Sequence, residues 1–200
     1  MEARHERDHH DWHSADYVDG WIAKDIKRDD RRRPLLAKAM AQAPFGRNDA
    51  VRILDVAGGY GAVSEAALKA FPKARVTIHD YSEVMLDRAR KHFAGGTGPI
   101  AYVQADLTDP AWTKRVGGPF DLVVSGIAIH NLHDPKPIGD CYRAIYTVLA
   151  PGGCFINCDH FDRAGGVDLH LKLLREAGYA QVACPVHEKP TGIIKAVRTA

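Results

Sequence analysis

The fold is decided by the stretch Asp55-Val56-Ala57-Gly58-Gly59-Tyr60-Gly61. The apolar run before it, Val51 to Val56, is typical of a buried strand, and Ala62 to Phe71 after it carries apolar residues at helical spacing. Small residues between a strand and a helix make a tight turn in which a ligand can approach the backbone. The stretch therefore predicts a strand, turn and helix that bind a nucleotide-like cofactor.

Downstream of this turn, β-branched runs alternate with helical patterns, as in a parallel sheet with crossover helices. Seven strands are predicted, over residues 51–56, 76–80, 101–106, 121–125, 153–158, 181–186 and 192–198. Helices are predicted over residues 62–71, 83–93, 137–149 and 167–177. Only residues 188–191 separate the last two strands, so we expect an antiparallel hairpin at the sheet edge. The predicted fold class is α/β, with a doubly wound, seven-stranded mixed sheet.

Residues 1–48 precede the first strand and have helical patterns over Ser14 to Asp29 and Arg32 to Ala43. We expect this segment to be a helical appendage, or lid, over the carboxyl ends of the strands, where open α/β sheets bind ligands. Residues 49–200 then form the main domain. The run Arg31-Arg32-Arg33 is interpreted as a solvated turn between the two helices.

Acidic residues end three successive strands. Asp80 ends the second strand, where a carboxylate can accept hydrogen bonds from both hydroxyls of a ribose. Asp106 ends the third, where it can accept from an exocyclic adenine amine while Leu107 packs against the ring. Asp55, at the end of the first strand, is expected to face the cofactor, which is unfavourable beside a pyrophosphate but favourable beside an ammonium and a sulfonium. The pattern disfavours a phosphate-bearing cofactor.

Five motifs together resemble the class I, Rossmann-like methyltransferases that use S-adenosylmethionine, of the small-molecule type. They are Leu54 to Gly61, Asp80-Tyr81-Ser82, Ala105-Asp106-Leu107, Phe120 to Ser125 and Leu149 to Gly153. The resemblance covers about Val51 to Arg198, which makes residues 49–200 the methyltransferase domain, and it implies S-adenosylmethionine as cofactor. The cofactor-binding residues that it implies are Asp55, Ala57, Gly58, Gly59, Gly61, Asp80, Tyr81, Asp106, Leu107 and Ser125.

The same resemblance gives some of these residues a place along the cofactor. It implies that Gly59 and Gly61 flank the methionine part and that Ser125 lines the floor near the sulfonium. Ala57 stands where the family usually has its first glycine. Tyr81 either stacks on the adenine edge or covers the core.

Three histidines are candidates for a catalytic base. Methyl transfer needs in-line approach of the acceptor, and a hydroxyl acceptor also benefits from a base because a neutral oxygen is a poor nucleophile. Imidazole can take up a proton near neutral pH. The fourth strand leads to His130 and His133 and the fifth to His160; we rank His130 first, then His160, then His133. The alternatives are that His130 only shapes the pocket and that His133, with Asp134, caps the next helix.

The N-terminal segment contains aromatic residues and histidines. Trp12, Tyr17 and Trp21 can share one helical face, where they either pack the segment onto the sheet or form the wall of a substrate-binding pocket. His9 and His13 have the helical spacing of a metal pair. No cysteine or glutamate in a recognised ligand spacing supports such a site, so no metal is predicted. A metal site that these histidines share with His130, His133 or His160 is left open.

Composition limits the partners. Lysine and arginine number 27 against 25 acidic residues, and no long stretch is uniformly basic, which indicates neither a nucleic-acid nor a membrane partner. The apolar runs are too short to span a bilayer, and the first dozen residues lack the apolar core of a secretory signal, so we expect a cytoplasmic protein. A homodimer is left open.

The predicted function is transfer of a methyl group from S-adenosylmethionine to a small organic acceptor. Oxygen ranks first as the atom methylated, followed by carbon and nitrogen. Two alternatives remain open: a regulatory module that binds S-adenosylmethionine without catalysis, and a nicotinamide-dependent oxidoreductase.

Overall fold

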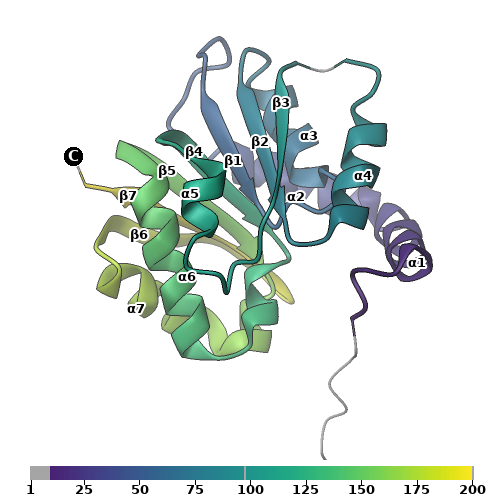
Figure 1. Cartoon of the computed structure of the whole chain (residues 1–200). Helices are drawn as coiled ribbons and strands as arrows, with labels where there is room; N and C mark the ends of the chain where they lie inside the picture. The colour runs from purple at the N-terminus through teal and green to yellow at the C-terminus, as the bar shows by residue number, and fades with distance from the viewer. Residues whose placement is uncertain (1–9, 97, 200) are drawn as a thin grey trace, which may run out of the picture.

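The structure, a computed structural model, describes residues 10–96 and 98–199 and contains one seven-stranded sheet with the order β3-β2-β1-β4-β5-β7-β6 (Figure 1). The strands are β1 (Arg52–Val56), β2 (Arg75–Asp80), β3 (Ile100–Gln104), β4 (Phe120–Gly126), β5 (Leu149–Asp159), β6 (Tyr179–Glu188) and β7 (Thr191–Arg198). Strands β1 to β5 are parallel, and β7 is antiparallel to both β5 and β6. The predicted mixed sheet with a C-terminal edge hairpin is confirmed.

Helices cover both faces of the sheet, as Figure 1 shows. They are α1 (Ala15–Ile26), α2 (Asp29–Met40), α3 (Ala62–Ala70), α4 (Glu83–His92), α5 (Trp112–Val116), α6 (Pro135–Val148) and α7 (Gly166–Glu176), with 3-10 turns η1 (Ile129–Leu132) and η2 (Phe161–Ala164). Because successive side chains of a strand point to opposite faces, Leu54 and Val56 of β1 pack in one core with α6 and α7, whereas Ile53 packs with α3 and α4.

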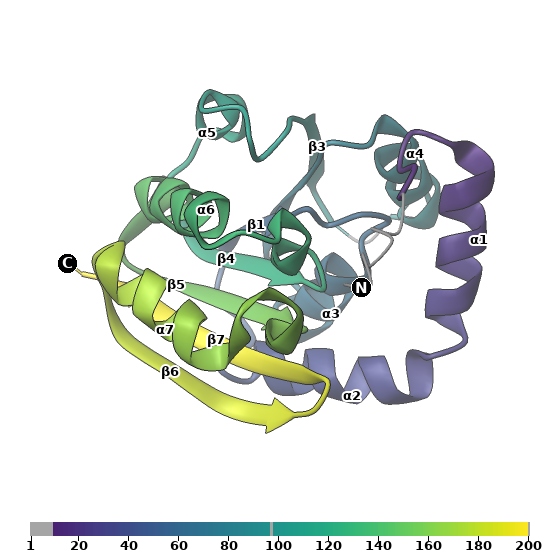
Figure 2. The same ribbon diagram turned by 90° about the horizontal axis from the view of Figure 1, so that it is seen from below.

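The N-terminal helices form a bent arm along one side of the molecule (Figure 2). Leu36 and Met40 of α2 are buried in the core that includes α3. Asp19 of α1 accepts hydrogen bonds of 2.6 and 2.8 Å from Arg88 of α4. Nζ of Lys38 in α2 donates a 2.6 Å hydrogen bond to Oε1 of Glu188, the last residue of β6. The arm is thus held to the sheet domain at several points.

The interpretation of residues 31–33 as a solvated turn is wrong. Helix α2 already begins at Asp29, and the Arg32 side chain is only 12% exposed, paired with Asp25 and Asp29. Asp29 and Asp30 lie in the first helical turn, where the helix dipole favours negative charge, and Asp29 pairs with Arg32 and Arg33 at helical spacing. The acidic pair therefore starts the helix instead of preceding it.

The start of β5 also differs from the prediction. The sequence predicts a helix over residues 137–149 and a strand from residue 153, yet β5 begins at Leu149. Its pairing with β4 shifts register between Phe120 and Leu122, and such an irregularity accommodates proline and glycine within a strand.

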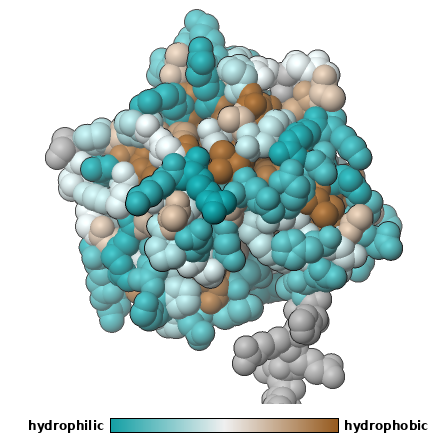
Figure 3. All heavy atoms as spheres, in the orientation of Figure 1, coloured by the Kyte–Doolittle hydropathy of each residue, from teal (hydrophilic) through white to brown (hydrophobic). Residues whose placement is uncertain are grey.

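The face seen in Figure 1 is mixed in character. Figure 3 shows hydrophobic residues in patches across the middle of this face, between hydrophilic side chains. Among residues 10–96 and 98–199, no helix has the length and apolar character needed to cross a membrane.

Candidate cofactor and acceptor site

The glycine turn between β1 and α3 requires glycine at two positions. Gly61 has φ +96°, and a Cβ there would lie 2.4 Å from Cε2 of Phe93. A Cβ on Gly58 would lie 2.7 Å from Cγ of Asp55. The turn therefore passes directly over the Asp55 side chain, at a distance that a larger residue would prevent.

Asp55 lies beneath this turn. It is fully buried, and its Oδ2 accepts a 2.6 Å hydrogen bond from Ser64 of α3, whereas Oδ1 has no partner in the part of the chain that the structure describes. Burial raises the pKa of Asp55 to about 7, and the Ser64 hydrogen bonds act in the opposite direction. The carboxylate does not line the cavity described below.

Asp80 connects the turn to the start of α4. Its Oδ2 accepts a hydrogen bond from the Gly59 amide and its Oδ1 from the Ser82 amide, each 2.9 Å long. Burial raises the pKa of Asp80 to about 6 despite these two donors. Each carboxylate oxygen has two lone pairs, so both can accept a further hydrogen bond from a ligand.

The ends of β3 and β4 supply other predicted residues. Asp106 is exposed and accepts 2.8 Å hydrogen bonds from the amide and hydroxyl of Thr108, next to the half-buried Leu107. Ser125 is buried and donates a 3.0 Å hydrogen bond to the carbonyl of Val56, so its hydroxyl ties β4 to β1. Tyr81 packs edge-on against His13, with ring centroids 5.0 Å apart.

A cavity of about 580 Å³ joins these strand ends to the N-terminal arm. This volume is within the range of small-molecule sites. Of the predicted cofactor residues, the cavity wall includes Ala57, Gly58, Gly59, Asp80, Tyr81, Asp106 and Leu107, but not Asp55, Gly61 or Ser125. The arm contributes His10, Trp12, Trp21, Asp25, Arg32, Leu35 and Leu36.

Two of the three aromatic residues proposed for the acceptor line this cavity. Trp12 and Trp21 do so, packed edge-to-face with centroids 5.3 Å apart. Tyr17 packs edge-on against Trp12, also with centroids 5.3 Å apart, and is not part of the wall. In this aromatic cluster, Tyr17 packs within the arm and the two tryptophans line the cavity, while their role in binding an acceptor stays a prediction.

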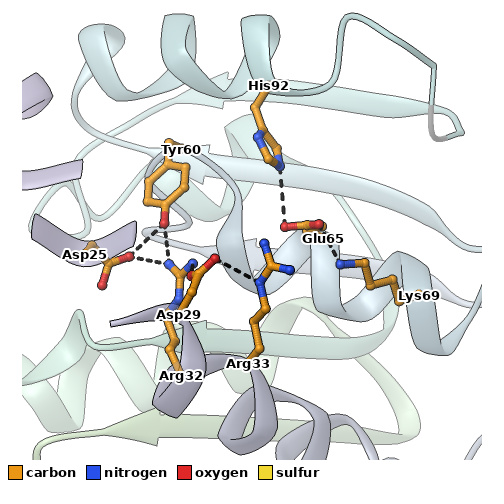
Figure 4. Close-up of polar contacts among 8 residues, drawn as sticks. All are labelled: Asp25, Asp29, Arg32, Arg33, Tyr60, Glu65, Lys69 and His92. Carbon is orange, nitrogen blue, oxygen red and sulfur yellow. Dashed lines mark hydrogen bonds and ion pairs between the residues drawn. The ribbon is translucent and has the colours of Figure 1, made fainter. Parts of the chain in front are cut away.

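A polar cluster between the arm and the glycine turn was missed by sequence reasoning (Figure 4). Tyr60 of the turn donates a 2.7 Å hydrogen bond to Oδ2 of Asp25, and Arg32 donates to both Asp25 and Tyr60. Burial, and then Asp25, raise the pKa of Tyr60. Nothing local in the sequence signals a contact between residues this far apart; the polar Tyr60 inside a glycine turn is the one available hint.

The three candidate bases have different surroundings. His130 is buried, and both its amide, at 3.0 Å, and its Nδ1, at 2.6 Å, bind the carboxylate of Asp159. Asp159 also accepts from the amide of His160, whose Nδ1 lies 3.2 Å from Thr191 Oγ1. His133 is exposed and lines the cavity, whereas His130 and His160 do not.

Backbone strain is concentrated at the cavity. Four non-glycine residues in the described part of the chain have positive φ, and three of them, Ala57 at +51°, Ile127 at +52° and His133 at +59°, line the cavity. Positive φ is costly for residues other than glycine, most of all for a β-branched one such as Ile127. Such strain is typical of ligand-binding sites.

The hypothetical pairing of His9 and His13 lies in part outside the described residues, since His9 is not among them. Within residues 10–96 and 98–199, no group of three or more histidine, cysteine, aspartate or glutamate side chains is arranged to hold a metal ion.

The chain is similar in sequence to known methyltransferase proteins. A family model described as "Methyltransferase domain" matches residues 53–153. The ubiquinone/menaquinone biosynthesis C-methyltransferase of Desulfotalea psychrophila is 30% identical over 122 residues, covering 61% of this chain and 44% of that protein. The carboxy-S-adenosyl-L-methionine synthase of Aeromonas hydrophila is 27% identical over 158 residues, covering 74% and 60%.

Solved structures show the same fold. An O-methyltransferase family protein from Burkholderia thailandensis superposes with a TM-score of 0.76 at 17% identity, covering 94% of this chain and 61% of that chain. The chain belongs to the methyltransferase domain family and, within it, to the class I methyltransferases that depend on S-adenosylmethionine. It spans about half the length of the curated relatives that it matches. Membership of this family favours a methyltransferase over the nicotinamide-dependent alternative.

Proposed function

We propose that the chain transfers a methyl group from S-adenosylmethionine to a hydroxyl oxygen of a small organic acceptor. The observation that carries this proposal is that one cavity is lined both by the strand ends that bind the cofactor in this family and by the N-terminal arm. Bound S-adenosylmethionine supplies a methyl group on a sulfonium. The acceptor loses its hydroxyl proton and gains the methyl group, and the electron pair of the broken carbon–sulfur bond goes to sulfur.

The charges around the cavity suit a cationic donor. Within the described residues, the wall carries the carboxylates of Asp25, Asp80 and Asp106 and the guanidinium of Arg32. An excess of carboxylates attracts an ammonium and a sulfonium and repels phosphates. Asp80 is assigned to the ribose hydroxyls, because its oxygens retain lone pairs beside the Gly59 amide. Asp106 is assigned to the adenine amine, with Leu107 against the ring.

We assign the proton-accepting role first to His133, because it alone of the three predicted bases lines the cavity. The buried pair of His130 and Asp159 holds the turn η1, whose last residue precedes His133. His130 is also a candidate base, since an imidazole held through Nδ1 by a carboxylate leaves Nε2 to accept a proton. His160 is assigned to the support of Asp159.

Residues 1–48 are proposed as the lid over the acceptor. The part of the cavity wall that this segment contributes is apolar at Trp21, Leu35 and Leu36 and acidic at Asp25. The contacts of Asp25 use Oδ2, which leaves Oδ1 without a hydrogen bond among the residues that the structure describes. We therefore expect an acceptor with an apolar body and a hydrogen-bond donor that reaches this oxygen.

Methylation at carbon is a second candidate, favoured by the name of the Desulfotalea relative, a C-methyltransferase. The two are separated by incubating the protein with S-adenosylmethionine and a panel of phenols, catechols, carboxylates, quinols and amines. S-Adenosylhomocysteine is measured by mass spectrometry, and the product is examined by NMR. A methoxy product supports the proposal, and a carbon-bound methyl group contradicts it. No product from any acceptor, despite tight cofactor binding, would favour the non-catalytic module.

A further inference from the structure

His79 accepts hydrogen bonds from the first two backbone amides of the glycine turn. It is the residue before Asp80, it is fully buried, and it pairs with Val56 where the β1–β2 ladder ends. The Gly58 amide donates to its carbonyl at 2.9 Å, and the Ala57 amide donates to Nδ1 of its ring at 3.3 Å. The imidazole thus provides the acceptor for an amide that lies beyond the end of the β1–β2 pairing.

Ala57 needs this partner because of its backbone conformation. Its φ of +51° is in the left-handed region, where a Cβ clashes with the backbone, so the conformation persists only if its surroundings enforce it. A buried amide left without an acceptor would also be costly. The hydrogen bond to Nδ1 meets both demands, since it pairs the amide and fixes the direction in which it points.

The ring is held in one protonation state. Because Nδ1 accepts a hydrogen bond, the ring proton is on Nε2, which is buried and has no hydrogen-bond partner among the described residues. The backbone of Ala105, the residue after β3, interacts with the imidazole and favours its protonated form. Trp112 packs against the ring at 5.1 Å between centroids. Burial lowers the pKa of His79 to about 4, so the imidazole is neutral at neutral pH. One neutral side chain at the end of β2 therefore accepts a hydrogen bond from the residue that follows β1.

We propose that His79 is a positioning residue of the cofactor site, whose Nδ1 holds Ala57 in the left-handed conformation that brings the Gly59 amide to Asp80. The inference rests on the proposed function only for the identity of the ligand. Cofactor affinity then depends on a hydrogen-bond acceptor at the place of Nδ1. A glycine at position 57 adopts positive φ freely, so a chain with this glycine no longer needs the acceptor.

The test is the dissociation constant of S-adenosylhomocysteine, measured by calorimetry on the full chain. In His79→Asn the amide oxygen can take the place of Nδ1, whereas in His79→Gln the amide reaches the place of Nε2 and leaves Ala57 unpaired. We expect H79N to bind within about threefold of the unmodified protein and H79Q about tenfold more weakly, as for loss of one buried hydrogen bond. Adding Ala57→Gly to H79Q should restore most of the affinity.

Equal losses in H79N and H79Q, or no recovery with A57G, would overturn the inference. A second measurement uses only the unmodified protein, so it does not require that a variant folds. Nitrogen-15 NMR should show the His79 ring as the Nε2–H tautomer, and the ring should not titrate between about pH 5 and pH 8. A proton on Nδ1 would overturn it as well. If the unmodified protein does not bind S-adenosylhomocysteine, the proposed function fails instead.

Discussion

The hydroxyl of Tyr60 lies 2.7 Å from Oδ2 of Asp25, so the glycine turn and α1 share a buried hydrogen bond. Arg32 of α2 donates to the same two side chains. The cofactor turn and both arm helices therefore meet at one cluster, and disturbing it should loosen the arm without removing any predicted cofactor contact.

Tyr60→Phe should destabilise the arm. The change removes one buried hydroxyl and leaves Asp25 with one partner fewer, at a cost of about 1 kcal/mol. Amide hydrogen exchange in α1 and α2 should become faster, while exchange in β1 and β4 stays the same. Tyr146→Phe is the matched control, because its hydroxyl contacts Thr199 at the exposed surface. Equal exchange in Y60F and Y146F would contradict the prediction.

Asp25→Asn and Asp29→Asn should distinguish a role of Asp25 in acceptor binding from its role in holding the arm together. Both aspartates pair with Arg32, but only Asp25 lines the cavity. Once an acceptor is known, we expect D25N to raise its KM about tenfold, as for loss of a charged hydrogen bond, and D29N to leave KM nearly unchanged. If D25N instead weakens S-adenosylhomocysteine binding, Asp25 serves the cofactor and the prediction is wrong.

Asp55 should make stability depend on pH. Its pKa is about 7 in the folded chain against an ordinary 3.8, so the folded state binds the proton more tightly and stability falls as the pH rises from about 4 through about 7. The whole difference corresponds to about 4 kcal/mol. Asp55→Asn should therefore stabilise the protein at pH 8.5 and change little at pH 4, as measured by urea unfolding. A D55N variant less stable than the unmodified protein at pH 8.5 would contradict this account.

Cofactor affinity should fall in acid. Burial raises the pKa of Asp80 to about 6, and only the ionised carboxylate can accept from both ribose hydroxyls while it holds the Gly59 amide. Affinity for S-adenosylhomocysteine should be constant above about pH 7 and approach a tenfold loss per pH unit below about pH 5. Calorimetry over this range measures it. Asp80→Ala should abolish binding, and a pH profile that is flat in the unmodified protein would exclude this role.

Replacing His133 should lower kcat and leave cofactor affinity intact. If His133 accepts the proton, His133→Ala should lose roughly 100-fold to 10,000-fold in kcat. His130→Asn should lose less, because it disturbs the turn before His133 but removes no wall residue. Steady-state kinetics decide between them, and a larger loss in H130N than in H133A would make His130 the base.

The sequence predicts the parts of the fold that depend on neighbouring residues. The turn at residues 57–61, the seven strands and the C-terminal hairpin follow from local apolar periodicity and from a short connection, and all are observed. Elements as short as α5 and η1 contain too few residues to show a period. The exact edges of α2 and β5 depend on charge pairs and register shifts, which periodicity does not reveal.

The site is predictable at the strand ends but not across the cavity. Asp80 and Asp106 lie where the sequence predicts, whereas the contact of Tyr60 with Asp25 joins distant residues and has no local signal. Asp55 is expected from the sequence to face the cofactor but does not line the cavity, because it shares a face of β1 with Ile53 and so points towards α3. The cytoplasmic location, the homodimer, the exclusion of nucleic-acid and membrane partners, and the boundary near residue 48 stay predictions.

Strand β7 lies between β5 and β6 although it follows both in the chain. Until residues 191–198 have left the ribosome, β5 is an open edge, with backbone donors and acceptors ready to pair with another chain. During synthesis the cofactor-binding half can therefore assemble early, while the nascent chain remains prone to aggregation until β7 inserts between β5 and β6.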